Sequence, residues 1–338
     1  MQLHRLLLDR LTMADAVRTY WLTTPCRIRR QDQSLRIERE NGDPVHVPVT
    51  DVRDIVALAP VDLNTAVVSL LAKYQIDVHL LSYYGDYAGS VLTAESQTSG
   101  ETILAQAALA TNPTARHQIA RALVDACAFN VRRVVDRKLL DRPYRVLAAA
   151  VAEAENRDQL MGIEGNFRRT AWEVLDTKLP KWLRLDGRSR RPPRNAGNAF
   201  ISYVNGIVYA RVLTAIRLTP LHSGIGFLHS SLERQRHALA LDLAEVFKPL
   251  FAERLLLRMA NRRQLEPHHF DTEVNQAMLS ADGRKLVVQA VRDELATTVL
   301  HRGLGRQVSY DELLHLEALK LTRACLEGEP YRPFRIWW

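Results

Sequence analysis

The stretch AGNAFISYVNGIVYARVLTAI, residues 196–216, is apolar on almost every side of a helical projection. A helix without a polar face has no surface to present to water, so this stretch predicts a helix buried inside the protein. Gly206 lies in its middle and weakens the helix by about 1 kcal/mol relative to alanine, unless close packing requires a glycine there.

Good helix formers flank this buried helix. Residues 101–157 are rich in Ala, Leu, Arg and Glu, and strand signals nearly vanish from about residue 95 to the C-terminus. The distinctive loop covers residues 186–195, where two prolines among four arginines predict a basic, non-helical connector. A solvated linker and a basic binding loop explain that composition equally well.

The N-terminal part of the chain carries a different pattern. Strand-forming residues alternate or cluster over residues 20–81, and Asn41-Gly42 is a turn signal between two such runs. Residues 63–73 predict one helix within this region. Its apolar face consists of Leu63, Val67, Leu70 and Leu71. Residues 1–19 predict a short amphipathic helix ahead of the first strand.

A run of strands followed by a run of helices favours segregated elements over a doubly wound sheet. We therefore expect an α+β protein with a small N-terminal β-rich domain and a larger all-α C-terminal domain. The expected boundary gives residues 1–94 and 95–338, and a chain of 338 residues is long enough for both.

The chain carries a formal net charge of +8. Lys and Arg contacts to phosphate release condensed counterions, so a balance of this sign favours a polyanionic partner. Nucleic acid is the partner that we expect, and an acidic membrane surface is the alternative. No run approaches the roughly 18 to 20 apolar residues of a membrane-spanning helix, so insertion into a membrane is not expected.

The three cysteines, Cys26, Cys127 and Cys325, are far apart and share no CxxC spacing. Neither a disulfide framework nor a zinc site is expected from them, and a reducing intracellular compartment fits best. The N-terminus has charges inside its apolar stretch, unlike a signal peptide. These features predict a cytoplasmic protein.

Two carboxylates stand out between Leu239 and Leu250, where apolar spacing predicts a helix. Asp242 and Glu245 are three residues apart, so they project one turn apart beside the apolar stripe of this helix. Like charges at this spacing repel each other unless a cation or base joins them. The pair is either part of a metal site or two ordinary acids on a solvated flank.

Two further segments offer partners for these acids. His229 ends the turn PLHSGIGFLH, residues 220–229, and a reversal of the chain would bring it to face Asp242 and Glu245. Glu164 stands among glycines at the expected start of a helix. The simpler interpretations are a core histidine and an acid favoured by the helix macrodipole. The functional interpretation is a divalent-metal site of carboxylates and neutral imidazole.

These segments resemble a known family, the Cas1 endonucleases of CRISPR systems, which are the integrase subunits of spacer acquisition. The matching motifs are Glu164-Gly165, the Gly-Phe-Leu-His of Gly226 to His229, and the Asp-Leu-x-Glu-x-Phe-x-Pro of Asp242 to Pro249. They occur in the family's order, and supporting matches span nearly the whole chain. The chain departs from the family pattern at Cys127, where a lysine is common.

The resemblance implies a metal site in which Glu164, His229 and Glu245 bind one Mg²⁺ or Mn²⁺. Asp242 would assist by tuning His229 or by holding a metal-bound water. Oxygen-rich ligation with one imidazole suits these hard cations better than zinc. The four residues form the catalytic set that the resemblance implies.

The resemblance also implies the activity and the partners. The activity is a metal-dependent DNA endonuclease and integrase that inserts captured fragments into a CRISPR array by phosphodiester strand transfer. The substrates would be double-stranded protospacer DNA and the CRISPR repeat, and the assembly a homodimer with a Cas2-family partner.

Several basic side chains near these motifs are candidates for phosphate contacts, although ordinary solvated charge is the simpler interpretation of each. They are Arg168, Arg169, Arg190, Arg191, Arg194 and Lys248. Two other functions stay open: a general metal-dependent nuclease or repair resolvase with the same site, and a non-catalytic DNA-binding scaffold.

Overall fold

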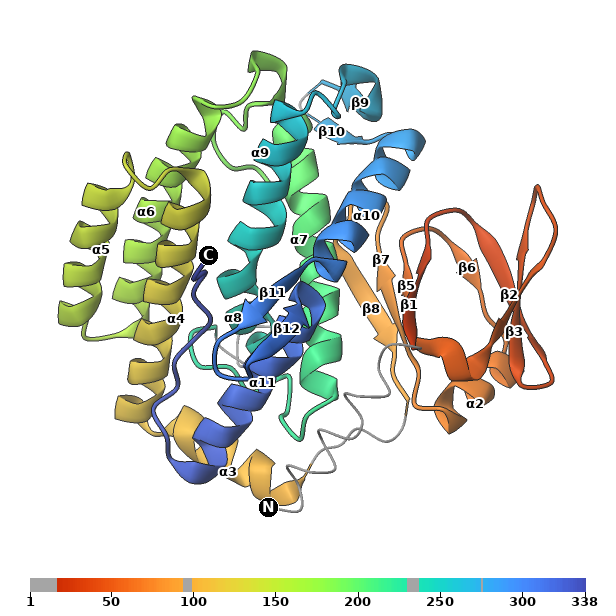
Figure 1. Ribbon diagram of the computed structural model, residues 1–338, viewed down its shortest axis with the longest axis horizontal. Coiled ribbons are helices and arrows are strands. Elements are labelled where there is room, and N and C mark those ends of the chain that lie inside the picture. The colour runs from red at the N-terminus through yellow and green to blue at the C-terminus, as the bar shows by residue number, and fades with distance from the viewer. Residues whose placement is uncertain (1–16, 94–98, 230–236, 275) are drawn as a thin grey trace. The chain divides into compact units, whose positions relative to one another are not determined.

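The computed structural model describes residues 17–93, 99–229, 237–274 and 276–338, and it contains two compact units (Figure 1). The units are Met1–Ser96 and Gln97–Trp338. The first is rich in strands and the second is mostly helical, so the predicted α+β class is confirmed. Of the helix predicted over residues 1–19, residues 1–16 lie outside the described part, and Arg18 and Thr19 belong to a strand.

The N-terminal unit contains two four-stranded sheets. One has the order β1 (Arg18–Leu22), β5 (Val52–Ala57), β7 (Asp77–Leu81), β8 (Tyr87–Val91), with β1, β5 and β7 parallel and β8 antiparallel to β7. The other has the order β4 (Val45–Pro48), β3 (Ser34–Arg39), β2 (Cys26–Gln31), β6 (Val61–Asp62), with antiparallel pairing except for β2 and β6.

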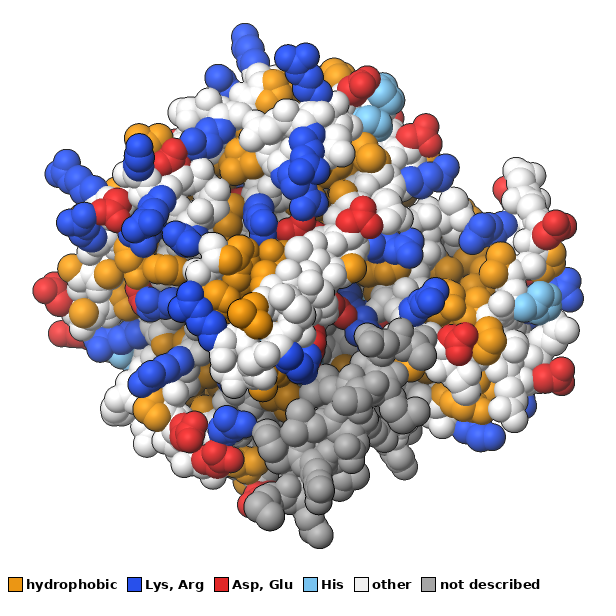
Figure 2. Space-filling model, viewed as in Figure 1, with side chains coloured by type: hydrophobic (Ala, Val, Ile, Leu, Met, Phe, Trp, Pro, Cys, Tyr) orange, Lys and Arg blue, Asp and Glu red, His pale blue; other side chains and the backbone are white. Residues whose placement is uncertain are grey.

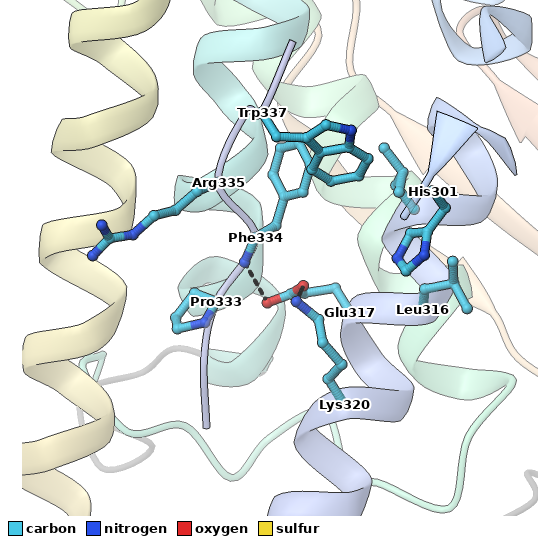
Figure 3. Close-up of a pocket in the computed structure, with 9 residues that line it drawn as sticks. His301, Leu316, Glu317, Lys320, Pro333, Phe334, Arg335 and Trp337 are labelled. Carbon is cyan, nitrogen blue, oxygen red and sulfur yellow. Dashed lines mark hydrogen bonds and ion pairs between the residues drawn. The ribbon is translucent and has the colours of Figure 1, made fainter. Parts of the chain in front are cut away.

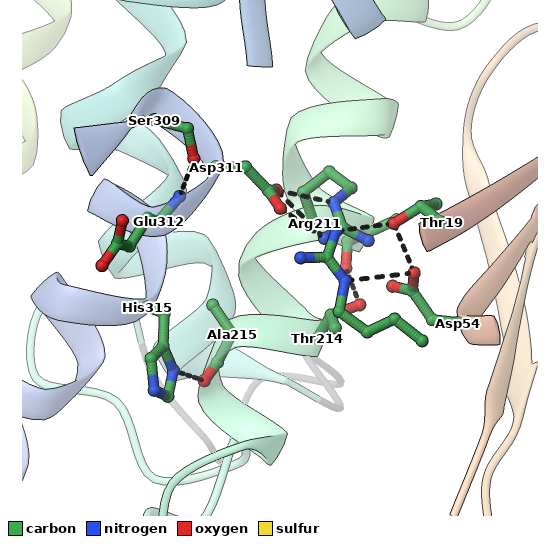
Figure 4. Close-up of polar contacts among 11 residues, drawn as sticks. Thr19, Asp54, Arg211, Thr214, Ala215, Ser309, Asp311, Glu312 and His315 are labelled. Carbon is green, nitrogen blue, oxygen red and sulfur yellow. Dashed lines mark hydrogen bonds and ion pairs between the residues drawn. The ribbon is translucent and has the colours of Figure 1, made fainter. Parts of the chain in front are cut away.

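The core of this unit draws on both sheets and on the helix α2 (Thr65–Lys73). The side chain of Asn64 caps α2 by accepting a hydrogen bond from the Val67 N–H, 3.0 Å away. Val67, Leu70 and Leu71 are buried, as their spacing predicts. At the sheet edge, the Thr19 hydroxyl donates a 2.5 Å hydrogen bond to the buried Asp54 carboxylate, which ties β1 to β5 (Figure 4).

The C-terminal unit is built mostly from helices. The helices are α3 (Gly100–Thr111), α4 (Pro113–Val135), α5 (Asp141–Glu153), α6 (Arg157–Asp176), α7 (Ala196–Arg217), α8 (Ala238–Lys248), α9 (Arg254–Asn261), α10 (Ala281–Ala296) and α11 (Tyr310–Glu327). Helices α4, α5 and α6 lie side by side, and α8 packs against both α4 and α7 (Figure 1). The elements that carry the predicted site residues therefore meet in one core.

Helix α7 is buried along most of its length, as its all-round apolar sequence predicts. Among the described helices it is the one long and apolar enough to cross a membrane, but 78% of its most apolar window lies inside the protein. Its Arg211 is paired with Asp311 at the start of α11, Nη2 to Oδ1 3.0 Å (Figure 4). It is therefore a core helix with a neutralised charge.

Two short hairpins accompany the helices, and the sequence pattern did not indicate them. They are β9 (Phe270–Glu273) with β10 (Gln276–Leu279), and β11 (Thr298–His301) with β12 (Arg306–Ser309). The larger unit is therefore mostly, and not purely, α-helical.

The arginine-rich connector before α7 is folded against the first turn of that helix. The Asn198 side chain accepts a 2.9 Å hydrogen bond from the Ser189 N–H and donates a 2.7 Å bond to the Leu185 carbonyl. A Cβ at Gly197 would lie 2.3 Å from the Leu183 carbonyl oxygen, so only glycine allows this approach. These contacts make the connector an ordered loop and not a loose linker.

The C-terminal segment from Tyr331 to Trp338 is an extended tail that joins three helices. The buried Glu317 of α11 accepts a 2.6 Å hydrogen bond from the Tyr331 hydroxyl. It also accepts a 3.0 Å hydrogen bond from the Phe334 N–H (Figure 3). Phe334 stacks on Phe247 of α8, with ring centroids 4.8 Å apart. The tail thus packs directly against the helix that carries Asp242 and Glu245.

Candidate metal centre

Three neighbouring helices bring a pair of glutamates and a thiol together. Glu164 comes from α6, Glu245 from α8 and Cys127 from α4. One ligand atom of each lies within 4.8 Å of the other two. Cys127 is buried, whereas the glutamate side chains keep 19% and 15% of their surface exposed, so the thiol lies behind the two carboxylates.

Glu164 does not lie at a helix start, contrary to the sequence expectation. Helix α6 begins at Arg157, and the Asn156 side chain caps it by accepting a 3.0 Å hydrogen bond from the Gln159 N–H. Glu164 is therefore inside the helix, where the macrodipole does not explain its presence. A Cβ at the neighbouring Gly162 or Gly165 would meet nothing within 4 Å, so the surface beside Glu164 is open.

Two basic groups partly neutralise the glutamate pair. The buried guanidinium of Arg168 lies 3.7 Å from Glu164 and 3.6 Å from Glu245, and the ammonium of Lys248 is hydrogen-bonded to Glu245. Both distances from Arg168 exceed a good charge-assisted hydrogen bond of about 2.8 Å, so Glu164 has no strong partner among the described residues.

Arg168 is held by a third carboxylate deeper in the core. Its Nη1 donates a 2.8 Å hydrogen bond to Oε1 of Glu253, which is 1% exposed. Glu253 ends a π-helical turn, Pro249–Glu253, that follows α8, and such turns are frequent at functional sites. Its other oxygen, Oε2, is buried and has no hydrogen-bond partner among the described residues.

The charge states of the two glutamates differ. Burial, followed by the negative charge of Glu245, raises the pKa of Glu164 above its ordinary value. Burial also opposes ionisation of Glu245, but Lys248 and Arg168 outweigh it and hold the pKa of Glu245 below its ordinary value. An ionised Glu164 is therefore the uncompensated charge of the group, and a cation would relieve it.

His229 and Asp242 form a separate, closely bonded pair. Asp242 is fully buried, and its oxygens accept hydrogen bonds from the N–H groups of Phe227, Leu228 and His229 at 2.6, 3.1 and 2.8 Å. Its Oδ1 lies 2.8 Å from Nδ1 of His229. Since a carboxylate accepts, Nδ1 carries a proton, and in the neutral ring Nε2 keeps its lone pair.

The turn before His229 is shaped by glycine. A Cβ at Gly226 would lie 2.8 Å from the Ala238 Cβ and 2.9 Å from the His229 carbonyl oxygen. Burial opposes protonation of His229, but Asp242 outweighs it and raises the pKa of His229 above its ordinary value. The chain folds back so that His229 faces Asp242, which is the arrangement that the functional interpretation of the sequence required.

His229 is not part of the tight group of ligand atoms. Within the described residues, the 4.8 Å group consists of Cys127, Glu164 and Glu245. The imidazole is close enough for its charge to lower the pKa of both glutamates, although it is a minor influence on each. The structure therefore brings the two glutamates together and places His229 beside them.

Comparison with known proteins identifies the family. The family model described as CRISPR associated protein Cas1 matches residues 19–293. A CRISPR-associated endonuclease Cas1 of Moorella thermoacetica is 36% identical over 95% of this chain and all of its own length, and one of Thermodesulfovibrio yellowstonii is 35% identical with the same coverage.

The chain belongs to the Cas1 family. The predicted family is therefore confirmed, and with it the function of a Cas1 endonuclease and integrase in CRISPR spacer acquisition.

Solved structures agree with the assignment. A Cas1 protein from Thermotoga maritima superimposes with a TM-score of 0.85 at 33% identity, over 94% of this chain and all of that one. A casposase bound to an integration product has the same fold, with a TM-score of 0.82 at 19% identity, over 94% of this chain and 93% of that one.

The basic residues expected to contact phosphate fall into two classes in this Cas1-family chain. Arg169, Arg190, Arg191 and Arg194 are exposed. Arg168 and Lys248 are buried and face carboxylates, so their charges are directed at the glutamate group. Figure 2 shows Lys and Arg side chains spread over the visible face of the helical unit and not gathered in one strip.

Sequence reasoning missed the residues that support the site from behind. Asn130 of α4 is fully buried, donates to the Val246 carbonyl at 2.9 Å and to the Phe334 carbonyl at 3.0 Å, and accepts from the Ile336 N–H at 2.9 Å. It therefore ties α8 to the C-terminal tail. A polar residue in the apolar stripe of a long helix was the available signal for such a role.

Proposed function

We propose that Glu164, Glu245 and His229 bind one Mg²⁺ or Mn²⁺ and that this centre cuts and joins DNA during integration into a CRISPR array. The observation that supports it most is the pair of glutamates within 4.8 Å, one of them without a strong partner. Two carboxylates and an imidazole with an available Nε2 suit a hard divalent cation.

Each residue has a separate task in this proposal. Glu164 and Glu245 supply anionic oxygens, and Asp242 fixes the ring of His229 so that Nε2 is the ligand atom. Lys248 and Arg168 hold the glutamates in place when the cation is absent and limit the repulsion between them. The open surface at Gly162 and Gly165 leaves room for a DNA backbone beside Glu164.

When bound, the cation polarises the phosphodiester and makes the attacking hydroxyl more acidic. In integration the attacker is the 3′-hydroxyl of the incoming DNA, and in hydrolysis it is water. The exposed Arg169, Arg190, Arg191 and Arg194 are proposed to contact phosphates. If they do, affinity falls with salt at a log–log slope of about −0.9 per neutralised phosphate.

The proposed assembly is a homodimer with a Cas2-family partner, acting on double-stranded protospacer DNA and the CRISPR repeat. A Cas6–RT–Cas1–Cas2 complex and a Cas1–DNA complex are among the structures that share this fold, which supports the proposal by analogy. We place the protein in the cytoplasm, where its three free thiols would stay reduced.

The test combines duplex oligonucleotide, a supercoiled repeat-containing plasmid and Mn²⁺. Wild type should cleave and join DNA only with the metal, and Glu164→Gln should reduce both by at least about 100-fold, as loss of a catalytic group does. Glu173→Gln is the matched control, because Glu173 is an exposed acid on the same helix. Full activity of Glu164→Gln would rule out the site.

The same assay separates the other two functions. A general nuclease or resolvase would cleave with Mn²⁺ but would not join the oligonucleotide to the plasmid at the repeat. A non-catalytic scaffold would bind DNA with no metal-dependent cleavage.

A further inference from the structure

The thiol of Cys127 faces the glutamate pair from the floor of the site. Its sulfur lies within 4.8 Å of a carboxylate oxygen of both Glu164 and Glu245. The side chain is 2% exposed, and no hydrogen bond to the sulfur is present within the described residues. A buried free thiol ordinarily packs as a small apolar side chain, whereas this one lies next to two acids.

We propose that Cys127, Glu164 and Glu245 form a binding site for a thiophilic divalent cation such as Zn²⁺ or Cd²⁺. This inference rests on the proposal that the two glutamates share a cation, and adds to it a sulfur donor that changes which cations bind tightly. Such a cation would compete with Mg²⁺ or Mn²⁺ for the same carboxylates.

The geometry supports this donor set. Zinc–sulfur bonds of about 2.3 Å and zinc–oxygen bonds of about 2.1 Å place neighbouring ligand atoms roughly 3.5 Å apart around a tetrahedral ion. The three atoms here lie within 4.8 Å of one another, so movements of about 1 Å complete the site. Small rotations of two partly exposed glutamate side chains provide movements of that size.

The charges support it as well. Within the described residues, the ion pairs of Glu164, Glu245 and Glu253 involve two basic groups, Arg168 and Lys248, which leaves one net negative charge in this ion-paired group. A divalent cation with one thiolate brings this group to neutrality. Binding forms a metal–sulfur bond and releases the thiol proton to water, with no transfer of electrons.

Donor chemistry determines the preference. Thiolate favours Zn²⁺ and softer cations, whereas Mg²⁺ gains little from sulfur. His229 lies beside the group and is available as a fourth ligand, which would give the mixed sulfur, nitrogen and oxygen set typical of zinc. The absence of CxxC spacing therefore does not exclude zinc here, because two of the donors are carboxylates.

The test is a titration of the full-length protein with Cd²⁺, in the absence of DNA, followed by the ultraviolet charge-transfer absorption of the thiolate–cadmium bond. Wild type should show this absorption saturating at one equivalent. Cys127→Ser should lose it and bind Cd²⁺ about tenfold more weakly or worse. Cys325→Ser, which removes another buried thiol, is the matched control and should keep it.

Competition provides a second readout on unaltered protein. Mn²⁺ should suppress the absorption in wild type, because both cations need Glu164 and Glu245, and Glu245→Gln should weaken Cd²⁺ binding. Absorption that persists in Cys127→Ser, that is missing in wild type, or that Mn²⁺ leaves unchanged would overturn the inference.

The two proposals fail separately. If Cd²⁺ binds as described and no Mn²⁺-dependent cleavage or joining occurs, the thiol-containing site stands and the proposed catalysis falls. If Mn²⁺-dependent cleavage and joining occur without the cadmium absorption, the proposed catalysis is supported and the thiol-containing site is rejected.

Discussion

The glutamate pair and the histidine–aspartate pair lie in the same helical unit, but they differ in how completely the protein hydrogen-bonds their carboxylates. Asp242 is fully buried and accepts hydrogen bonds from three backbone N–H groups and from His229. Among the described residues, the one ion pair of Glu164 is with the Arg168 guanidinium, 3.7 Å away, and the charge of Glu245 repels it. One carboxylate is satisfied by the protein alone, and the other is not.

This difference separates two kinds of work. A carboxylate whose two oxygens both accept hydrogen bonds stabilises the fold and orients its neighbour, because its removal leaves buried donors without partners. A carboxylate that is partly exposed and short of partners is suited to bind something else. Asp242 should therefore control the stability of the protein, and Glu164 should control metal binding.

The largest effect on stability is expected for Asp242→Asn. The amide keeps one acceptor oxygen, so about two of the four hydrogen bonds are lost, at a cost of roughly 4 kcal/mol in the free energy of unfolding. Urea unfolding measures it, with Glu173→Gln as the control. A loss below about 1 kcal/mol would show that the stability of the protein does not depend on the hydrogen bonds of Asp242.

Addition of Mn²⁺ should stabilise wild type by an intermediate amount. A ligand that binds only the folded state contributes about 2.7 kcal/mol when its concentration is 100 times its dissociation constant. Thermal unfolding of wild type should shift upward accordingly, and removal of the metal with a chelator should reverse the shift. Glu164→Gln should show almost no shift, and an equal shift in both proteins would contradict the assignment.

Glu253→Gln should cost about 2 kcal/mol in the free energy of unfolding, because Arg168 keeps a hydrogen bond to the amide oxygen but loses its anionic partner. Arg168 would then be shared more evenly between Glu164 and Glu245. Urea unfolding measures the loss, and calorimetric titration with Mn²⁺ tests the second consequence, which is weaker binding of the metal. Unchanged stability would mean that Arg168 does not depend on this carboxylate.

The smallest effect is expected for Glu164→Gln without metal. The pKa of Glu164 is raised in the folded protein, so its contribution to stability is present at low pH and is lost as the pH rises through that value. The glutamine variant lacks this loss and should be at least as stable as wild type at pH 7. The free energy of unfolding of both proteins should be measured at pH 4 and pH 7. The stability of wild type relative to the glutamine variant should be lower at pH 7 than at pH 4.

Much of the fold could be predicted because it is encoded locally. The apolar sequence of α7 indicated its burial, and the apolar spacing of α2 indicated which of its residues are buried. The hairpins β9–β10 and β11–β12 could not be predicted, because strands of four residues are too short to show a period. The start of α6 could have been predicted, because Asn156 followed by Gln159 is a capping signal.

The site was predictable only in part. The sequence allowed His229 to face Asp242 if the chain folds back, and the structure shows the two side chains 2.8 Å apart. The inward orientation of Arg168 and the approach of Cys127 to the glutamates depend on how α4, α6 and α8 pack. Spacing along one helix carries no information about such contacts between helices.

The proposed metal site requires that Glu164, Glu245 and His229 share one divalent cation. The most direct measurement is anomalous scattering from crystals of the wild-type protein grown with Mn²⁺. We expect a manganese peak within bonding distance of both glutamate carboxylates and of Nε2 of His229. A peak elsewhere, or no peak with Glu245 still bound to Lys248, would contradict it.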